Sequence, residues 1–329
     1  MSNYNVGDMI RLTRQAIGMS QEELSDNICS VQTLSRIENG KVKVKKRIYQ
    51  QLMERMGRDG AKNYSVLSAE NLEILDIMVE VDNAIFYKDY SLAELKLNRL
   101  KEGLSVEEEI NYLYIRECEI LIDSGLHRMS KEKELEELEK LSTLIVPDYK
   151  QYLGKVYPFM RTEVVLLMNI GSVYGALGQR KMAIDIYYML IRSMNTGYMR
   201  QEDSIQLIVM LISNAARYYG GLGKRDTAIR MSWNAIHKAK RHQLYTVLPK
   251  CYGEIAWNMM KQIEAGERDA ADEELCRQYL RQSYATAVLS HQKWQAEASE
   301  KTYSYFWGED IYCLSGSPKN ESSGSSLHN

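Results

Sequence analysis

Residues 20–40 of this 329-residue chain, SQEELSDNICSVQTLSRIENG, predict two short helices joined by a tight turn. Ser20 is suited to cap the first helix, and Glu23 three residues later completes a capping box. Ser30 caps the second helix, and Gly40 ends it because glycine tolerates positive φ. Apolar side chains at helical spacing supply the buried faces: Leu24, Ile28, Leu34 and Ile37. The stretch therefore predicts a helical hairpin whose second helix has a free outer face.

The outer face of this second helix carries Val31, Gln32, Ser35 and Arg36. Side chains at the start of such a helix reach base edges when the helix lies in the major groove of DNA. We therefore interpret these four residues as candidate base contacts and predict binding of double-stranded DNA. The alternative is a helical hairpin within a larger bundle, but the cap, the turn and the helix stop together favour DNA binding.

Residues 6–56 resemble the XRE-type helix-turn-helix domain of phage repressors at several spaced positions. The run Ile-Glu-Asn-Gly at 37–40 matches the usual end of that family's recognition helix. The resemblance implies a phosphate contact for Gln21 and a structural pair between Arg14 and Glu38 that ties the first helix to the third. It also implies base contacts for Val31, Gln32 and Arg36, and phosphate contacts for Lys41, Lys43 and Arg47.

Positive charge is concentrated near the amino terminus, although the whole chain has a net charge of −2. Residues 1–60 carry ten Lys and Arg against seven Asp and Glu. Five basic residues fall within seven positions directly behind the hairpin: Lys41, Lys43, Lys45, Lys46 and Arg47. Such a run is often only a solvated surface, but behind a DNA-contacting helix it indicates phosphate contacts and salt-sensitive binding.

The five cysteines are dispersed without C-x-x-C spacing, at positions 29, 118, 251, 276 and 313. This distribution indicates reduced thiols in a cytoplasm rather than a disulfide framework. The amino terminus lacks the apolar core of a signal peptide, and the most apolar runs, such as 205–212, are too short to cross a bilayer. We expect a soluble cytoplasmic protein without a membrane partner.

The rest of the chain predicts an all-α protein. Between residues 67 and 307 apolar side chains recur at helical spacing, and the whole sequence has four prolines. We expect a lambda-repressor-like helix-turn-helix domain over residues 1–60, a linker over 61–66, a helical repeat domain over 67–310 and a disordered tail over 311–329.

Two segments of the expected repeat domain share one pattern. Ile170-Gly171-x-x-Tyr174-x-x-Leu177-Gly178 aligns with Ala215-Ala216-x-x-Tyr219-x-x-Leu222-Gly223. The pattern resembles the tetratricopeptide repeat, in which small residues let two antiparallel helices approach closely. The copies are 45 residues apart, against about 34 in that family, so either the helices are extended or the linking loop is long.

Weaker helical units surround the two aligned copies. They cover 72–87 with 92–104, 111–125 with 132–145, a helix around 252–259 with 274–290, and a final helix at 295–307. A stripe of apolar residues from Leu135 to Ile145 is interpreted as core packing rather than as a dimerising zipper. Together the units predict a tetratricopeptide-like right-handed superhelix of about five helical pairs with a concave inner wall.

Asn169 and Asn214 occupy the same position in the two aligned copies, on first helices that line the concave wall in tetratricopeptide repeats. An amide offers two donors and an acceptor, which suits the backbone of an extended peptide. We add Arg217 as a partner for a ligand carboxylate, and Met168, Met210 and Trp257 as adaptable apolar contacts. The alternative is that both asparagines bond neighbouring helices.

An XRE-type domain followed by a degenerate tetratricopeptide array resembles the RRNPP family of peptide-pheromone-sensing regulators from Gram-positive bacteria. The specific motifs lie in residues 6–56 and 166–236. The resemblance implies a cytoplasmic homodimeric transcription factor of quorum sensing, whose repeat domain binds a short signalling peptide. Peptide binding would then favour one curvature of the superhelix and set the distance between two DNA-binding heads, which must lie about 34 Å apart. The direction of the response stays open.

Other functions find less support in the sequence. The run at 220–224 approaches a phosphate-binding loop, but Arg225 follows where a Walker loop needs Ser or Thr. His237 and His242 lack a third ligand, so we expect no metal site, and we expect no cofactor. No catalytic constellation indicates an enzyme. The alternative of a different class is a DNA-bound adaptor whose repeat domain binds a protein partner.

Overall fold

In the computed structural model of the chain, the described residues are 6–42, 44–57, 72–103, 109–146, 148–195 and 201–312. They form α-helices and short 3-10 turns, and no β-strand occurs among them. The all-α class expected from the sequence is confirmed. The expected linker over 61–66 lies outside the described residues.

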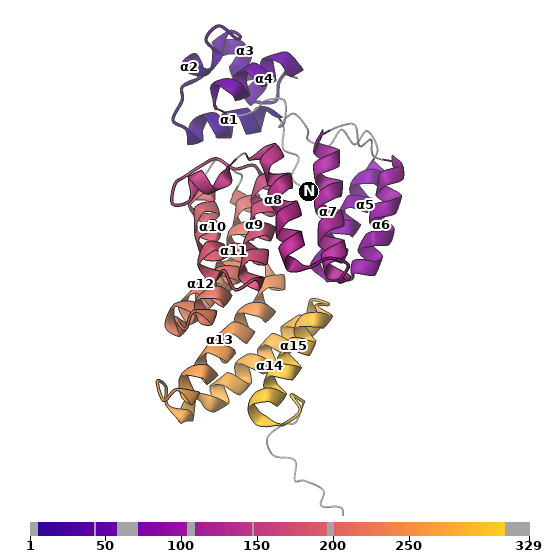
Figure 1. Cartoon of the computed structure of the whole chain (residues 1–329). Coiled ribbons are helices and arrows are strands. Elements are labelled where there is room, and N and C mark those ends of the chain that lie inside the picture. The colour runs from indigo at the N-terminus through magenta and orange to yellow at the C-terminus, as the bar shows by residue number, and fades with distance from the viewer. Residues whose placement is uncertain are drawn as a thin grey trace, which may run out of the picture.

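Four helices form the amino-terminal group: α1 (Val6–Ala16), α2 (Gln21–Ser25), α3 (Val31–Glu38) and α4 (Lys46–Arg55). Figure 1 shows them gathered together, apart from the helices that follow. Six side chains at their centre are fully buried: Ile10, Leu24, Leu34, Tyr49, Leu52 and Met53. Burial of each such side chain stabilises the group by about 1.5–3 kcal/mol.

The hairpin predicted from residues 20–40 is present, with its caps. The Ser20 hydroxyl accepts a hydrogen bond from the Glu23 amide at 3.1 Å, and the Glu23 carboxylate accepts one from the Ser20 amide at 2.6 Å. At the start of α3, the Ser30 hydroxyl accepts a bond from the Thr33 amide at 3.1 Å. Gly40 follows α3 with φ at 67°, so the helix ends where the sequence predicts.

Beyond residue 71, the described helices pair into five hairpins and one further helix (Figure 1). The hairpins are α5 (Leu72–Phe86) with α6 (Tyr90–Gly103), α7 (Glu109–Gly125) with α8 (Lys131–Ile145), α9 (Arg161–Ala176) with α10 (Arg180–Met194), α11 (Gln201–Gly221) with α12 (Arg225–Arg241), and α13 (Leu248–Glu264) with α14 (Glu273–Leu289). The last helix, α15 (Lys293–Trp307), packs against α14 and α13. These bounds lie within a few residues of those expected from the sequence.

Short 3-10 segments shape three of the connections: η1 (Tyr149–Tyr152), η2 (Tyr245–Val247) and η3 (Ala270–Asp272). At the carboxyl-terminal end, Ile311 is buried, and the Tyr312 hydroxyl donates to the Glu300 carboxylate at 2.9 Å. Both residues belong to the segment expected to be a disordered tail. Its remainder, 313–329, lies outside the described residues.

Close helix packing in the first aligned copy depends on its glycines. A Cβ on Gly171 would lie 2.6 Å from the ring of Tyr187, and a Cβ on Gly175 would lie 2.0 Å from the ring of Tyr218. These two tyrosine rings stack with centroids 5.9 Å apart. The longer spacing of the copies has a partial explanation, since α11 has 21 residues against 16 in α9.

The apolar core extends through the stacked hairpins from α7 to α14, and a second cluster lies between α5, α6 and α7. Leu138 and Leu141 are buried in the first cluster, and Leu135 and Ile145 pack against it. The leucine stripe of α8 is therefore core packing. Within the described part of the chain, none of the helices has the length and apolar character needed to cross a membrane.

Candidate functional site

The outer face of α3 is open among the described residues. Val31, Gln32 and Arg36 are exposed and Ser35 is half-buried, whereas Leu34 and Ile37 on the opposite face are buried. The Ser30 cap fixes the first turn of the helix, which is the turn that approaches bases in helix-turn-helix proteins. Four side chains are thus presented on one face of a short, capped helix.

A buried charged pair fixes α3 against α1. Arg14 donates from Nε to Glu38 Oε1 at 2.7 Å and from Nη2 to Glu38 Oε2 at 2.9 Å. Arg14 Nη1 also donates to the Met19 carbonyl at 2.9 Å. The bidentate geometry is the stronger form of this ion pair, so the angle between the two helices is specified by polar contacts as well as by the core.

Gln21 joins the same network, because its Nε2 donates to Glu38 Oε2 at 2.6 Å. Glu38 therefore already orients the Gln21 side chain, which is predicted to contact a DNA phosphate. Lys41 and Arg47, two of the other predicted phosphate contacts, are exposed. Lys43 lies outside the described residues.

Sequence reasoning missed Gly7, where the backbones of α1 and α3 meet. A Cβ at this position would lie 1.8 Å from the carbonyl oxygen of Ile37. A glycine inside an amphipathic helix is the signal that could have identified this contact, since it often marks close packing. Arg55 was also missed; from α4 it donates to the carbonyls of Glu23, at 3.3 Å, and Asp26.

The two predicted peptide-binding asparagines lie on α9 and α11, the first helices of neighbouring hairpins. Asn169 Nδ2 donates to Glu117 Oε1 on α7 at 2.8 Å. Asn214 Oδ1 accepts a hydrogen bond from the Lys250 amine on α13. Each asparagine thus bonds a charged side chain of an adjoining hairpin, which is the helix-bonding alternative raised by the sequence.

These contacts belong to a set of polar side chains on the first helices of successive hairpins, which we call the inner polar stripe. Met210, Asn214 and Arg217 share one face of α11, because they follow i, i+4, i+7 spacing. Lys250, Glu254 and Trp257 share one face of α13 for the same reason. The inner polar stripe comprises Glu117, Asn169, Asn214, Arg217, Lys250 and Glu254.

The titratable side chains of the inner polar stripe are partly buried. Burial raises the pKa of Glu117 to about 7, and the charge of Asp82 adds to the shift, although the bond from Asn169 opposes it. Burial, together with the charge of Arg217, lowers the pKa of Lys250 to about 8. Burial also raises the pKa of Glu254. All three residues are half-buried rather than fully enclosed, so protein surrounds them while one side stays open to solvent.

The apolar candidates differ in their exposure. Met168 is buried in the core, and Met210 is half-buried and packs against it. Trp257 is exposed and lies beside Tyr305 and Phe306 of α15, with ring centroids 5.8 and 5.3 Å apart. In this structure Trp257 is therefore the one of the three that presents an open apolar surface beside the inner polar stripe.

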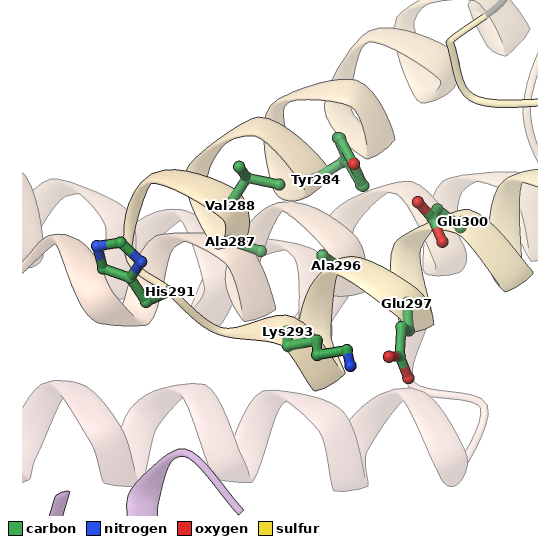
Figure 2. A pocket seen from close by; sticks show the side chains of 8 residues that line it. All are labelled: Tyr284, Ala287, Val288, His291, Lys293, Ala296, Glu297 and Glu300. Carbon is green, nitrogen blue, oxygen red and sulfur yellow. The ribbon is translucent and has the colours of Figure 1, made fainter.

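A separate pocket of about 490 Å³ opens between α14 and α15 (Figure 2). It is lined by Tyr284, Ala287, Val288, His291, Lys293, Ala296, Glu297 and Glu300. None of the residues predicted from the sequence lines it. Across the described ranges, no group of three His, Cys, Asp or Glu side chains is arranged to hold a metal ion.

Comparison with known families finds a match to the helix-turn-helix family over residues 10–62. The amino-terminal part of this chain is a helix-turn-helix domain. The match supports the DNA binding expected for this part of the chain. No curated protein matches the chain.

Solved structures similar to the chain include PlcR from Bacillus thuringiensis in complex with the peptide PapR7 and DNA. That structure is 18% identical, with 90% of this chain and 98% of PlcR covered and a TM-score of 0.58. The apo form of PlcR is 17% identical, covering 88% and 97% of the two chains, with a TM-score of 0.52. The apo form of ComR from S. thermophilus is 15% identical, covering 91% and 98%, with a TM-score of 0.50.

At these identities the similarity shows the fold. The chain has the architecture of PlcR and ComR, with the helix-turn-helix domain followed by stacked helical hairpins, so the fold expected from the sequence is confirmed. The helix-turn-helix domain was found from sequence with its caps. Glu117, Lys250 and Glu254 were not, although the i, i+4 spacing of the last two was a usable signal.

Proposed function

We propose that this chain is a cytoplasmic, sequence-specific transcription regulator that binds an operator through α3 and a short extended signalling peptide along the inner polar stripe. The observation that carries the proposal is the open outer face of α3, held at a fixed angle by the buried pair of Arg14 and Glu38. A rigid, capped helix with an exposed polar face matches the requirement for reading a major groove.

At the DNA end, each candidate residue has a chemical role. Gln32 and Arg36 are suited to bidentate bonds with adenine and guanine, and Val31 to contact with a thymine methyl group. Ser35 supplies a hydroxyl that bonds either base type. Gln21, Lys41, Lys43 and Arg47 would fix the register through phosphates without reading sequence.

At the peptide end, the side-chain amides of Asn169 and Asn214 are proposed to hydrogen-bond the backbone of the bound peptide. Glu117 and Lys250 orient these amides in the unbound chain, and a bound peptide would share or replace those bonds. Arg217, Met210 and Trp257 lie on the same faces of α11 and α13. PlcR, whose fold this chain shares, has been solved with both a peptide and DNA, which supports the pairing of the two functions.

The proposed response is a shift between curvatures of the hairpin stack in a homodimer. A ligand shifts such an equilibrium in proportion to its difference in affinity for the two states. Two DNA-binding heads meet successive major grooves when they lie about 34 Å apart, so a modest change in curvature alters operator affinity.

Selection of bound oligonucleotides from a random duplex pool tests the DNA end. We expect the full chain to enrich one motif, and Gln32→Ala or Arg36→Ala to cost about 1–3 kcal/mol at one position of it. Arg47→Ala should weaken binding to all sequences alike and reduce the salt slope by about one unit. Enrichment of no motif, or base-specific loss with Arg47→Ala alone, would contradict the assignment of α3.

Selection from a pool of random heptapeptides tests the peptide end. We expect the full chain to retain a defined subset and the double variant Asn169→Ala, Asn214→Ala to lose it. Asn234→Ala is the matched control, because Asn234 is an exposed asparagine on α12. If the double variant retains the same peptides, the proposed hydrogen bonds from the two amides are refuted. If the full chain retains no peptide but still binds DNA, the adaptor alternative is favoured.

A further inference from the structure

Three cations from distant parts of the chain converge near the inner polar stripe. Lys88 belongs to the turn between α5 and α6, Arg217 to α11, and Lys250 to α13. We call these three residues the cation triad. Lys250 bonds Asn214, and Arg217 follows Asn214 by one helical turn on the same face. The triad therefore combines the first, fourth and fifth hairpins.

Lys88 also contacts the last helix of the stack. Its amine lies 3.8 Å from the centroid of the Trp294 ring, at the start of α15. A lysine over the face of an indole ring is a favourable cation–π geometry. The contact joins two segments separated by more than two hundred residues, so the first hairpin and α15 meet at Lys88.

The members of the cation triad act on one another electrostatically. The pKa of Lys88 is lowered by burial, and also by the charges of Arg217 and Lys131. The pKa of Lys250 is lowered to about 8 by burial first, then by Arg217, with a smaller contribution from Lys88. These mutual effects require the three charges to be close in space.

Two cations of the triad share one carboxylate. Glu254 is the carboxylate whose charge acts on both Lys250 and Arg217. Lys131, the fourth cation, has its own carboxylate in Glu134, 2.6 Å away. Glu254 thus faces two cations, Lys250 and Arg217, in a partly buried site, and there an added anion gains more than it would at an open surface.

Trp294 adds a second, independent observation that points to a ligand. Its indole Nε1 is buried and has no hydrogen-bond acceptor among the described residues. An unsatisfied buried donor costs about 1–3 kcal/mol. This donor belongs to the ring that Lys88 contacts, so an unsatisfied polar group lies beside the cation triad.

We propose that the cation triad binds a carboxylate of the signalling peptide, so that the effector is a peptide with an acidic side chain or a free carboxyl terminus placed at this point of the inner polar stripe. This inference rests on the proposed function. A carboxylate held by all three cations links the first hairpin to the fourth and fifth. Peptide binding then acts on the curvature of the whole stack through one anchored group.

The test uses the full chain and three pools of random heptapeptides. The first pool has free carboxyl termini, the second is amidated, and the third is amidated and made without Asp and Glu. We expect retention from the third pool to fall by roughly 10- to 100-fold, which is the loss of one or two charge-assisted hydrogen bonds. The difference between the first two pools shows whether the carboxylate is terminal or from a side chain.

Charge reversal at the triad makes the test specific. Arg217→Glu should abolish the preference for carboxylate-bearing peptides and enrich peptides with Lys or Arg instead, and Lys88→Gln should weaken the preference without a reversal. Arg230→Glu is the control, because Arg230 is an exposed arginine on α12. Melting curves of all variants by circular dichroism show that each is folded.

Two failures are distinguishable. If no pool yields retained peptides, peptide binding itself fails, and the proposed function fails with it. If all three pools are retained equally, by the native chain and by Arg217→Glu, the carboxylate inference is overturned while peptide binding stands.

Discussion

At the scale of single residues, the pair of Arg14 and Glu38 shows how a charged contact shapes a DNA-binding surface. Both side chains are buried between α1 and α3. A buried ion pair adds little stability over apolar residues of similar volume, but loss of one partner strands the other charge. The pair therefore specifies the orientation of α3 more than it strengthens the domain.

Glu38→Ala should destabilise the helix-turn-helix domain by about 3–5 kcal/mol, because it leaves the Arg14 guanidinium buried without its carboxylate. Hydrogen exchange of the amides of α1 to α3 measures this local loss in the full chain. Glu54→Ala, at an exposed position on α4, is the control and should leave exchange unchanged. Equal protection in the two variants would show that the pair is dispensable.

Glu117 makes the folding stability of the unbound chain depend on pH, and the sign of this dependence follows from its pKa. Its pKa is about 7 in the fold, against an ordinary value of 4.5, because of burial. The folded state therefore binds more protons than the unfolded state between these values, and stability falls as pH rises from about 4.5 to about 7.

Glu117→Gln keeps an acceptor for Asn169 and removes the titration. The variant should be more stable than the native chain by about 1–3 kcal/mol at pH 8, and the difference should vanish near pH 4.5. Denaturant unfolding followed across this range measures it, with Glu102→Gln at an exposed site on α6 as control. A stability difference that grows toward low pH would reverse the assigned sign.

At the scale of elements, the crossing of α1 and α3 depends on the absence of one side chain. A Cβ at Gly7 would lie only 1.8 Å from the Ile37 carbonyl oxygen, which leaves no room for a methyl group. The carbonyl belongs to the backbone of α3, so neither helix can yield by a change of rotamer. The recognition helix is thus positioned by backbone packing as well as by the ion pair.

Gly7→Ala should separate α1 from α3 and cost about 1–3 kcal/mol or more. Operator affinity of the full chain, measured by fluorescence anisotropy, should fall with it because the base contacts lose their fixed angle. Gln15→Ala, at an exposed position on α1, supplies the control. Unchanged affinity in Gly7→Ala would show that the contact is relieved elsewhere.

The helices themselves were predictable, since each buries one face and repeats its apolar residues at helical spacing. The starts of α2 and α3 and the end of α3 were predictable from their caps. The end of α2 was not, because α2 stops at Ser25 and Ile28, expected on its buried face, lies half-buried in the turn. The partners of the two asparagines were not, because Glu117 lies 52 residues from Asn169 and Lys250 lies 36 residues from Asn214. Such contacts depend on how successive hairpins stack, which the local pattern does not contain.

The same limit explains the burial of Met168. The aligned pattern placed it beside Asn169 on the first helix of a hairpin, but the helical rotation from one residue to the next turns its side chain into the core. Trp257, in contrast, follows Glu254 and Lys250 at i+3 and i+7 spacing and so stays on the open face.

At the scale of the whole molecule, two surfaces that are separate in sequence carry the two proposed activities. The outer face of α3 offers base contacts, and the inner polar stripe crosses four successive hairpins from α7 to α13. Because the stripe draws on several hairpins, the proposal is that a ligand bound along it alters how they stack. The proposed function therefore requires coupling between the two surfaces.

The most direct measurement is operator affinity of the full chain with and without a peptide selected by that chain, at one fixed salt concentration. We expect a change of about 5- to 150-fold, in either direction, that disappears in the double variant Asn169→Ala, Asn214→Ala. An operator affinity that stays the same while the peptide is bound would contradict this coupling.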